Sequence, residues 1–221
     1  MNLNPPKPTA AMRVRVTYAK EGAMRYTGHL DLQRVWERIL RRSRLPVAYS
    51  QGFHPQVRLN LASALPLGMT SQCEVLDFWL YETIDPTVVA KILRPVMPPG
   101  LTVQDVQEVD LHTPALQILM RFSDFEVIFL EPIEPTGFIQ RVLALLAAET
   151  LPREWRQKNY DLRPLIQSLE VIPPDPTHPL RLTMRLSSQE NANARPEEVI
   201  AALGFDSLTT RIRRTALIFV S

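Results

Sequence analysis

Five arginines lie close together in the first quarter of this 221-residue chain: Arg34, Arg38, Arg41, Arg42 and Arg44. Their spacing of three or four residues places several of them along one exposed stripe if the segment is helical. A row of guanidinium groups of this kind can neutralise successive phosphates of a nucleic acid. The alternative is a solvated helix face on which Glu37, the single acidic residue of the stretch, pairs with Arg41.

A second candidate binding segment follows at residues 49–55, with the sequence Tyr-Ser-Gln-Gly-Phe-His-Pro. It combines a glycine, two aromatic rings, a histidine and polar donors, and aromatic faces beside positive charge suit the stacking of unpaired bases. The alternative is a turn whose two rings fill the core. The residues that would bind are Tyr49, Gln51, Phe53, His54 and the nearby Arg58.

A third group precedes the arginines. His29 and Asp31 follow the segment Arg25-Tyr26-Thr-Gly and lie in the first turn of the expected helix. The helix dipole favours the Asp31 carboxylate there, while the imidazole of His29 can act as a general acid or base. In a ribonuclease, Tyr26 would assist His29, and Arg25 would stabilise the developing phosphate charge. The alternative for His29 is a capping or hydrogen-bonding role.

Two polar groups in the second half are weaker candidates. Asp161 and Arg163 can contribute to binding or can pair with each other. Arg211 and Arg213 share one face of an expected terminal strand and would extend the basic surface. Glycine-rich phosphate loops and nucleophile elbows are absent from the sequence.

The cysteine and histidine content argues against a protein-bound metal or other cofactor. Cys73 is the only cysteine, which excludes an internal disulfide and a cysteine cage for zinc or an iron–sulfur cluster. No two of the four histidines have the i, i+4 spacing of a helical metal site. No apolar stretch approaches the roughly 20 residues of a membrane span, and the first residues lack the pattern of a secretory signal. We therefore expect a cytoplasmic protein without a membrane partner.

Charge is unevenly distributed although the net charge is only +2. Residues 1–60 hold 11 Lys and Arg against 3 Asp and Glu, residues 61–150 hold 4 against 12, and residues 151–221 hold 10 against 8. The basic first segment favours an anionic partner. The acidic middle segment, around Asp105, Glu108 and Asp110, offers a surface for a protein partner.

Hydrophobic periodicity predicts the elements that position these residues. The first half is expected to contain a strand at 12–19, a helix at 29–44, strands at 56–62 and 72–82, a helix from 85 to about 95, and a strand at 101–109. The order then repeats with a strand at 116–130, a helix at 134–149, strands at 162–172 and 180–186, a helix from 195 to 204, and a strand at 211–220.

Both runs have the strand, helix, strand, strand, helix, strand order of the ferredoxin-like fold. The sequence therefore predicts an α+β protein of two tandem ferredoxin-like halves with antiparallel sheets. A disordered arm at residues 1–11 would precede a first half at 12–112 and a second half at 113–221.

Several motifs resemble those of the uncharacterised radical SAM-linked protein family, whose domain of unknown function is found alone or attached to a radical SAM enzyme. They are the runs 25–34, 41–46, 49–55 (Tyr-Ser-Gln-Gly-Phe-His-Pro), 64–68 (Ala-Leu-Pro-Leu-Gly), 161–164 (Asp-Leu-Arg-Pro) and 214–215 (Arg-Thr). The resemblance implies a radical SAM enzyme as partner. It also favours a binding site formed jointly by the helix start and the loop at 49–55, with His29, Asp31 and His54 included. This chain has no Cys-x-x-x-Cys-x-x-Cys triad, so it would be the linked partner and not the catalyst.

The expected architecture is also similar, more weakly, to the CRISPR repeat-processing RNA endonucleases. His29 matches the histidine at their first strand-to-helix junction, but the glycine-rich C-terminal loop of those enzymes is not seen here. The resemblance implies that His29, if it has a chemical role, acts on RNA.

Three functions follow from these patterns. The leading interpretation is a non-catalytic RNA-binding or RNA-positioning module, with transfer or ribosomal RNA as partner. The second is a subunit that docks a radical SAM enzyme. The third is a metal-independent ribonuclease that uses His29.

Overall fold

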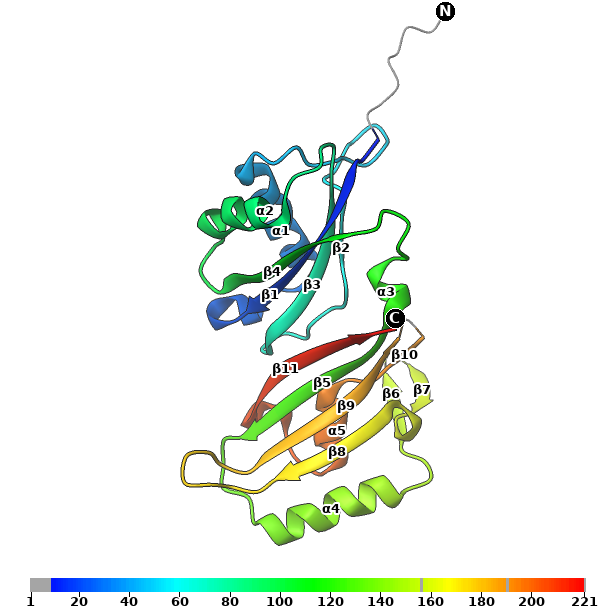
Figure 1. Ribbon diagram of the computed structural model, residues 1–221. Coiled ribbons are helices and arrows are strands. Elements are labelled where there is room, and N and C mark those ends of the chain that lie inside the picture. Colours follow the sequence, from blue (N-terminus) through cyan, green and yellow to red (C-terminus); the bar gives the residue numbers. More distant parts are fainter. Residues whose placement is uncertain (1–8, 156, 190, 221) are drawn as a thin grey trace, which may run out of the picture. The chain divides into compact units, whose positions relative to one another are not determined.

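The computed structural model describes residues 9–155, 157–189 and 191–220 (Figure 1). The chain divides into two compact units, Met1–Leu67 with Glu74–Leu116, and Gly68–Cys73 with Gln117–Ser221. The boundary predicted from the sequence, at residues 112–113, would instead place residues 68–73 in the first half. Most of the predicted arm, residues 1–8, lies outside the described residues, and the N–H of Ala11 donates to the carbonyl of Leu80 (2.8 Å).

The first unit has the element order that the sequence predicted. Its elements are β1 (Met12–Lys20), the 3₁₀ helix η1 (Gly22–Tyr26), α1 (His29–Ser43), β2 (Leu59–Leu61), β3 (Thr70–Leu80), α2 (Pro86–Leu93), the 3₁₀ helix η2 (Arg94–Val96) and β4 (Leu101–Val109). The strands follow the order β4-β1-β3-β2, with β4 antiparallel to β1 and β2 antiparallel to β3.

Alternation along the strands separates an apolar face from a polar one. Val14, Val16 and Tyr18 of β1 lie in the core of the first unit together with Trp36 of α1. The rings of Tyr18 and Trp36 meet edge to face with centroids 4.8 Å apart. Burial of this apolar stripe fixes α1 on one face of the sheet.

The opposite face of β1 carries charged side chains that are buried or partly buried. Arg13 is only 2% exposed, because its guanidinium donates to the fully buried Asp77 of β3 (2.9 and 2.5 Å). It also donates to the carbonyls of Thr113 and Pro114. Arg15 binds the same carboxylate (2.8 Å). A buried ion pair thus replaces water on this face.

The second unit contains a larger set of elements than predicted. They are β5 (Met120–Phe129), α4 (Pro135–Ala147), β6 (Pro152–Trp155), β7 (Lys158–Asp161), the 3₁₀ helix η3 (Arg163–Leu165), β8 (Ile166–Ile172), β9 (Arg181–Gln189), β10 (Ala192–Asn193), α5 (Pro196–Ala202), the 3₁₀ helix η4 (Ser207–Thr209) and β11 (Thr210–Phe219). Strand β5 lies between β11 and β9, and β8 and β10 both pair with β9, all antiparallel. Residues Thr70 and Ser71 pair in parallel with β11.

Three segments differ from prediction for local reasons. Strand β2 is shorter than residues 56–62, because Val57 forms a bridge with Tyr49 and the N–H of Arg58 donates to Ala48 (2.8 Å). The expected strand start at 116 is the short helix α3 (Leu116–Leu119). The expected strand at 162–172 begins only at Ile166, because Pro164 lies within η3, and the β6–β7 hairpin precedes it.

The α+β class and the predominance of antiparallel strands agree with the sequence prediction. Within the described residues, no helix combines the length and apolar character needed to cross a membrane.

Candidate nucleic-acid interface

The arginines of α1 lie on the exposed side of the helix. Arg34 pairs with Asp31 one turn earlier (2.9 Å), and both side chains are 66% exposed. The other four, Arg38, Arg41 and Arg42 of α1 and Arg44 directly after it, are exposed and have no side-chain ion pair with any described residue. The expected Glu37–Arg41 pair is absent from the described contacts, and Glu37 instead accepts from Gln33 (3.4 Å). The positive charge at the end of α1 is therefore available to an anion.

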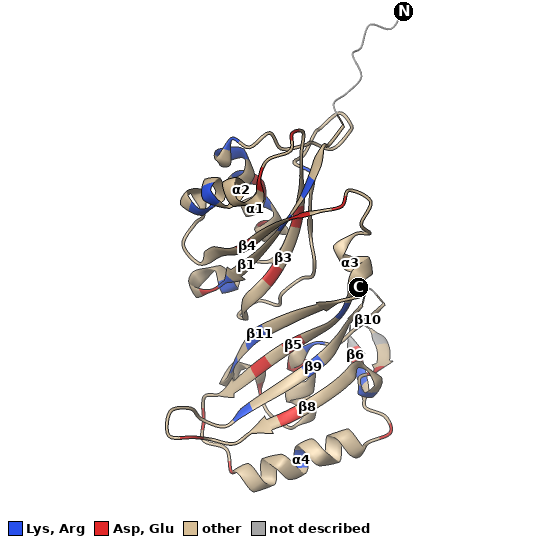
Figure 2. Ribbon diagram, in the orientation of Figure 1, with Lys and Arg blue, Asp and Glu red and all other residues tan. Residues whose placement is uncertain are grey.

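A neighbouring helix adds positive charge that the sequence analysis missed. α2 packs against α1, and Lys91 and Arg94 at its C-terminal end are exposed. Figure 2 shows basic residues on both helices. The signal in the sequence was a lysine and an arginine in the last turn of the second expected helix, where the helix dipole also favours cations.

The loop at residues 49–55 projects its central side chains into solvent. Its ends are held together by the N–H of Ser50, which donates to the Gln56 carbonyl (2.8 Å), and by the N–H of Gln56, which donates to Ser50 Oγ (3.0 Å). Gly52 has a φ of 139°, which a residue with a Cβ rarely adopts. Phe53 is fully exposed and His54 is exposed. Phe53 therefore does not fill the core.

The start of the loop is anchored differently. Tyr49 is half-buried and packs against the core, so the alternative of a core-filling ring holds for this residue alone. Its backbone N–H donates to the hydroxyl of Tyr81 (3.2 Å). Tyr49, Gln51 and Arg58 line a cavity of about 260 Å³. The guanidinium of Arg58 lies over the ring of Trp79, 4.2 Å from its centroid.

His29 begins α1 and is half-buried. Burial lowers its pKa below the ordinary value of 6.5; the carboxylate of Glu74 opposes this shift and the ammonium of Lys20 adds to it. Lys20 at the end of β1 and Glu74 in β3 are 1% and 2% exposed, and Lys20 Nζ donates to the Thr27 carbonyl just before the helix (2.9 Å). Two buried charges thus lie beside a histidine that favours its neutral form.

The sequence analysis did not include Lys20 or Glu74. The available signal was a charged residue next to an apolar strand segment: Lys20 ends the first strand, and Glu74 interrupts an otherwise apolar run. Such charges are rarely buried without partners.

Arg25 and Tyr26 lie in η1, before His29. Arg25 Nη2 donates to the Tyr26 hydroxyl (2.8 Å), and the guanidinium lies 4.7 Å from the centre of the Tyr26 ring. Tyr26 is exposed. These two side chains form a local pair, and no described contact joins them to His29.

The predicted residues of the first unit fall into two groups. His29, with Arg25 and Tyr26, lies at the start of α1, whereas the loop at 49–55 follows its end. The 15-residue helix α1, about 22 Å long, lies between the two groups in the sequence, and no described contact joins them.

Asp161 and Arg163 lie in the second unit and have local structural contacts. The Asp161 carboxylate accepts from the N–H groups of Leu151 (2.7 Å) and Arg163 (2.9 Å). The Arg163 guanidinium donates to the carbonyls of Leu146 (2.8 and 3.2 Å) and Ile166 (3.3 Å). The two side chains do not pair, and both are engaged by the backbone.

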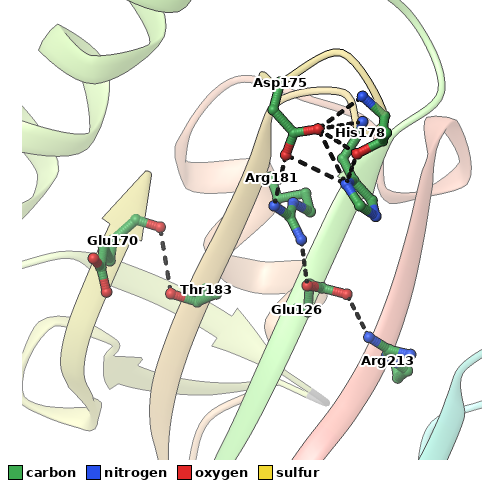
Figure 3. A network of polar contacts seen from close by, with 8 residues as sticks. Glu126, Glu170, Asp175, His178, Arg181, Thr183 and Arg213 are labelled. Carbon is green, nitrogen blue, oxygen red and sulfur yellow. Dashed lines mark hydrogen bonds and ion pairs between the residues drawn. The ribbon is translucent and has the colours of Figure 1, made fainter. Parts of the chain in front are cut away.

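The basic end strand of the second unit is partly neutralised. Arg213 pairs with Glu126 (2.8 Å), which also faces Arg181 (3.5 Å), and Arg181 reaches Asp175 (3.7 Å), as Figure 3 shows. Hydrogen bonds from Thr177 and His178 lower the pKa of the Asp175 carboxyl, so it stays ionised beside Arg181. The expected extension of a basic surface is thus reduced to the exposed Arg211.

Comparison with known proteins yields a structural likeness and a family. No curated protein matches the chain. A solved chain in "Crystal Structure of a Cbf5-Nop10-Gar1 Complex" is similar over 92% of this chain and 48% of that one, with 10% identity and a TM-score of 0.51. A chain in "Crystal structure of the archaeal box H/ACA sRNP Nop10-Cbf5 complex" is similar over 91% and 46%, with 8% identity and a TM-score of 0.45. The chain thus spans about half the length of these solved chains. The likeness to the first of them concerns the fold alone.

A sequence family described as "Uncharacterized protein conserved in bacteria" (DUF2344) matches residues 13–196, which hold α1, the loop at 49–55 and the Asp161–Arg163 segment. Since this range covers most of the chain, the protein belongs to that family.

Proposed function

We propose that the first unit binds single-stranded RNA, with phosphates on the arginines at the end of α1 and bases on the loop at 49–55. One observation carries the proposal: Phe53 is fully exposed in a loop that follows directly after four arginines without ion-pair partners among the described residues.

An exposed phenylalanine does not stabilise the fold by burial, which would contribute roughly 1.5–3 kcal/mol to the free energy of folding. A ring presented beside guanidinium groups fits a stacking partner that carries negative charge. Stacking on an aromatic side chain contributes about 1–3 kcal/mol per base and tolerates any sequence.

The arginines of α1 make a separate, testable contribution. Each phosphate contact on a single strand changes the slope of log affinity against log salt by about 0.7. Replacing Arg38, Arg41 and Arg42 by Gln should therefore lower the slope by about 2 and weaken binding most at low salt. Fluorescence anisotropy with labelled fragments of transfer and ribosomal RNA, at about 50 and 200 mM salt, measures both quantities.

Phe53→Ala should weaken binding about 5- to 150-fold with an unchanged salt slope, because the ring carries no charge. Arg141→Gln, which removes an exposed arginine of α4 in the second unit, is the control. Binding that is insensitive to salt, or equal in the triple variant and the Arg141 variant, would contradict the proposal.

We also infer that the chain consists of two tandem ferredoxin-like halves, at 12–112 and 113–221. The support is the shared strand order. In the first unit β1 lies between β4 and β3, and β2 pairs with the far side of β3. In the second unit β5 lies between β11 and β9, and β8 pairs with β9.

The second candidate is docking to a radical SAM enzyme. The observation in its favour is that β4 is the outer strand of its sheet and carries the exposed Asp105 and Glu108, with Asp110 just beyond it. Replacing all three by Asn or Gln should abolish co-purification with a cluster-bearing enzyme after nuclease treatment. Charged residues also protect outer strands from aggregation, so the absence of any such partner would favour that simpler role.

The third candidate is RNA cleavage at His29. Its lowered pKa keeps the imidazole neutral near pH 7, as a general base requires, and the Arg25–Tyr26 pair lies in the preceding turn. RNA should then be cut in the presence of a chelator and spared by His29→Ala. RNA that stays intact with the wild-type protein would exclude this activity.

A further inference from the structure

Three neighbouring strands of the second unit, β11, β5 and β9, carry a group of charged side chains on the sheet face opposite the buried core. Alternation along β5 leaves Glu126 and Ile128 on this face. Residues that are aligned on neighbouring strands share a face, so Ile128 lies between Arg211 of β11 and Arg181 of β9. Glu126 lies in the next row, opposite Arg213 of β11. Three guanidinium groups thus surround one carboxylate and one apolar side chain.

The place of Arg211 in the sheet explains why it lacks an acidic partner. Its neighbour on β5 is the apolar Ile128, and it has no side-chain ion pair with a described residue. Arg213 faces Glu126 and donates to it through Nη2 (2.8 Å), which leaves Nε and Nη1 without a described partner. Arg211 is exposed and the Arg213 side chain is 41% exposed, so a ligand can reach both guanidinium groups from solvent.

The carboxylates near these arginines are already compensated. Glu126 binds Arg213 with one oxygen and faces Arg181 with the other (2.8 and 3.5 Å), and Arg181 also reaches Asp175 (3.7 Å), as Figure 3 shows. Arg181 and Arg213 together balance the two acidic groups. The charge of Arg211 remains and attracts an anion to this face.

The same side chains line a cavity of about 330 Å³. Its walls include Arg181, Arg211, Arg213 and Glu126, together with Thr70, which pairs with Arg213 on the other edge of β11. The Thr70 hydroxyl has no side-chain hydrogen bond with a described residue and can donate one to a ligand. All these residues belong to the second unit. The volume lies near the lower end of the roughly 300–1,000 Å³ of small-molecule sites, so a small ligand fits.

We propose that this cavity binds the terminal phosphate of a small phosphorylated molecule, with the phosphate on Arg211, Arg213 and the Thr70 hydroxyl. A phosphomonoester has three terminal oxygens and a charge of about −1.5 to −2, so it can bind both guanidinium groups and the hydroxyl at once. A carboxylate or a phosphodiester presents only two such oxygens and a single charge. The carbon atoms next to the phosphate lie against Ile128. This site belongs to a different unit from the RNA surface proposed above and does not depend on it.

The direct test is a titration of the ¹⁵N-labelled full chain with ribose 5-phosphate, followed by heteronuclear NMR. The side-chain Nε–H signals of Arg211 and Arg213, assigned by their loss in Arg211→Gln and Arg213→Gln, should shift and reach saturation. Dimethyl phosphate, a phosphodiester, should shift them less at the same concentration, and sodium chloride at the same ionic strength should leave them in place. Equal shifts with ribose 5-phosphate and dimethyl phosphate, or shifts that follow ionic strength alone, overturn the proposal.

Arg211→Gln should weaken the binding of ribose 5-phosphate about 10- to 150-fold, read from the Arg213 signal, because it removes hydrogen bonds to a charged group. The variant should keep its fold, since Arg211 is exposed and has no ion pair with a described residue, and circular dichroism checks this. Arg141→Gln removes an exposed arginine of α4, outside the cavity, and should bind as the wild type does. Equal affinities of the wild type and of folded Arg211→Gln overturn the site.

A comparison with RNA separates a small phosphorylated ligand from the backbone of a nucleic acid. Single-stranded RNA should bind Arg211→Gln/Arg213→Gln as tightly as it binds the wild type. A loss of RNA affinity as large as that of the α1 triple variant would show that these arginines hold RNA phosphates, and it would overturn the small-molecule site.

Discussion

At the scale of single residues, the first unit places several charges out of contact with water. Asp77 is fully buried and receives both Arg13 and Arg15, so its carboxylate compensates two guanidinium groups. Lys20 and Glu74 are buried beside His29. Removing one partner from such an arrangement leaves an uncompensated charge in a medium of low polarity.

Asp77→Asn should therefore lower the free energy of unfolding by about 3–5 kcal/mol, as is typical when one partner of a buried ion pair is lost. Urea denaturation followed by circular dichroism measures the change. Asp31→Asn, which breaks the exposed pair with Arg34, should cost at most about 1 kcal/mol and serves as the control. Equal effects of the two substitutions would show that the buried network does not stabilise the unit.

His29 gives the molecule a predictable response to acid. Because its pKa is lowered in the folded state, the unfolded chain binds more protons as the pH falls below 6.5. The contribution of His29 to stability should therefore decline from pH 6.5 downward and be constant above it. Relative to the wild type, His29→Gln should gain stability as the pH falls from 7.5 to 5.5, measured as the difference in urea midpoints. A difference that is independent of pH would contradict this assignment.

At the scale of elements, hydrogen bonds from side chains determine where several helices and loops end. Arg163 bridges the end of α4 and the start of β8 through the carbonyls of Leu146 and Ile166. A helix leaves its last carbonyls without intrahelical partners, and a guanidinium satisfies one of them here.

Arg163→Met should destabilise the second unit by about 1–3 kcal/mol, since it leaves the Leu146 carbonyl without this donor. Hydrogen exchange should show the effect first in the last turn of α4. Arg153→Met is the comparison, because the guanidinium of Arg153 donates only to the adjacent Pro152 carbonyl among the described contacts. Unchanged exchange in α4 would mean that water replaces Arg163 without loss.

The sequence predicted the regular elements better than those that depend on tertiary contacts. Periodicity alone located β1, α1 and β4 to within about one residue, because each buries a regular apolar stripe and ends at a proline, a glycine or a polar loop. It could not locate the β6–β7 hairpin or shorten β2, because those depend on backbone partners chosen by tertiary contacts. Neither the Arg13–Asp77 pair nor the Lys20–Glu74 neighbourhood of His29 was predictable, since each joins strands distant in the sequence.

The candidate site shows the same division. Exposed arginines follow from helical spacing, and the loop was recognisable from its composition. That Tyr49 packs inward while Phe53 points outward depends on the closure of the loop by Ser50 and Gln56, which composition does not reveal.

At the scale of the whole molecule, a short piece of chain that lies between two parts of the first unit counts with the second unit. Residues 68–73 count with the second unit, where Thr70 and Ser71 pair with Arg213 and Arg214 of β11, while the rest of β3 belongs to the first.

Ser71→Pro removes an N–H and restricts the backbone at this pairing. We expect faster hydrogen exchange in β11, by a factor that corresponds to about 1–3 kcal/mol. Gln72→Ala, at the exposed neighbouring position, should leave the exchange of β11 unchanged, and equal rates in both variants would contradict this role of Ser71.

The pairing of residues 70 and 71 with β11 has a consequence for synthesis on the ribosome. Chains emerge from the N-terminus and domains fold in that order, so residues 70 and 71 are released long before residues 213 and 214 are made. The partner of this backbone segment is thus a strand that is translated much later, and until then the segment lacks its pairing with β11. A nascent chain that stalls or ends before β11 would keep that edge open, and we expect such truncated products to require chaperones that a chain containing β11 does not need.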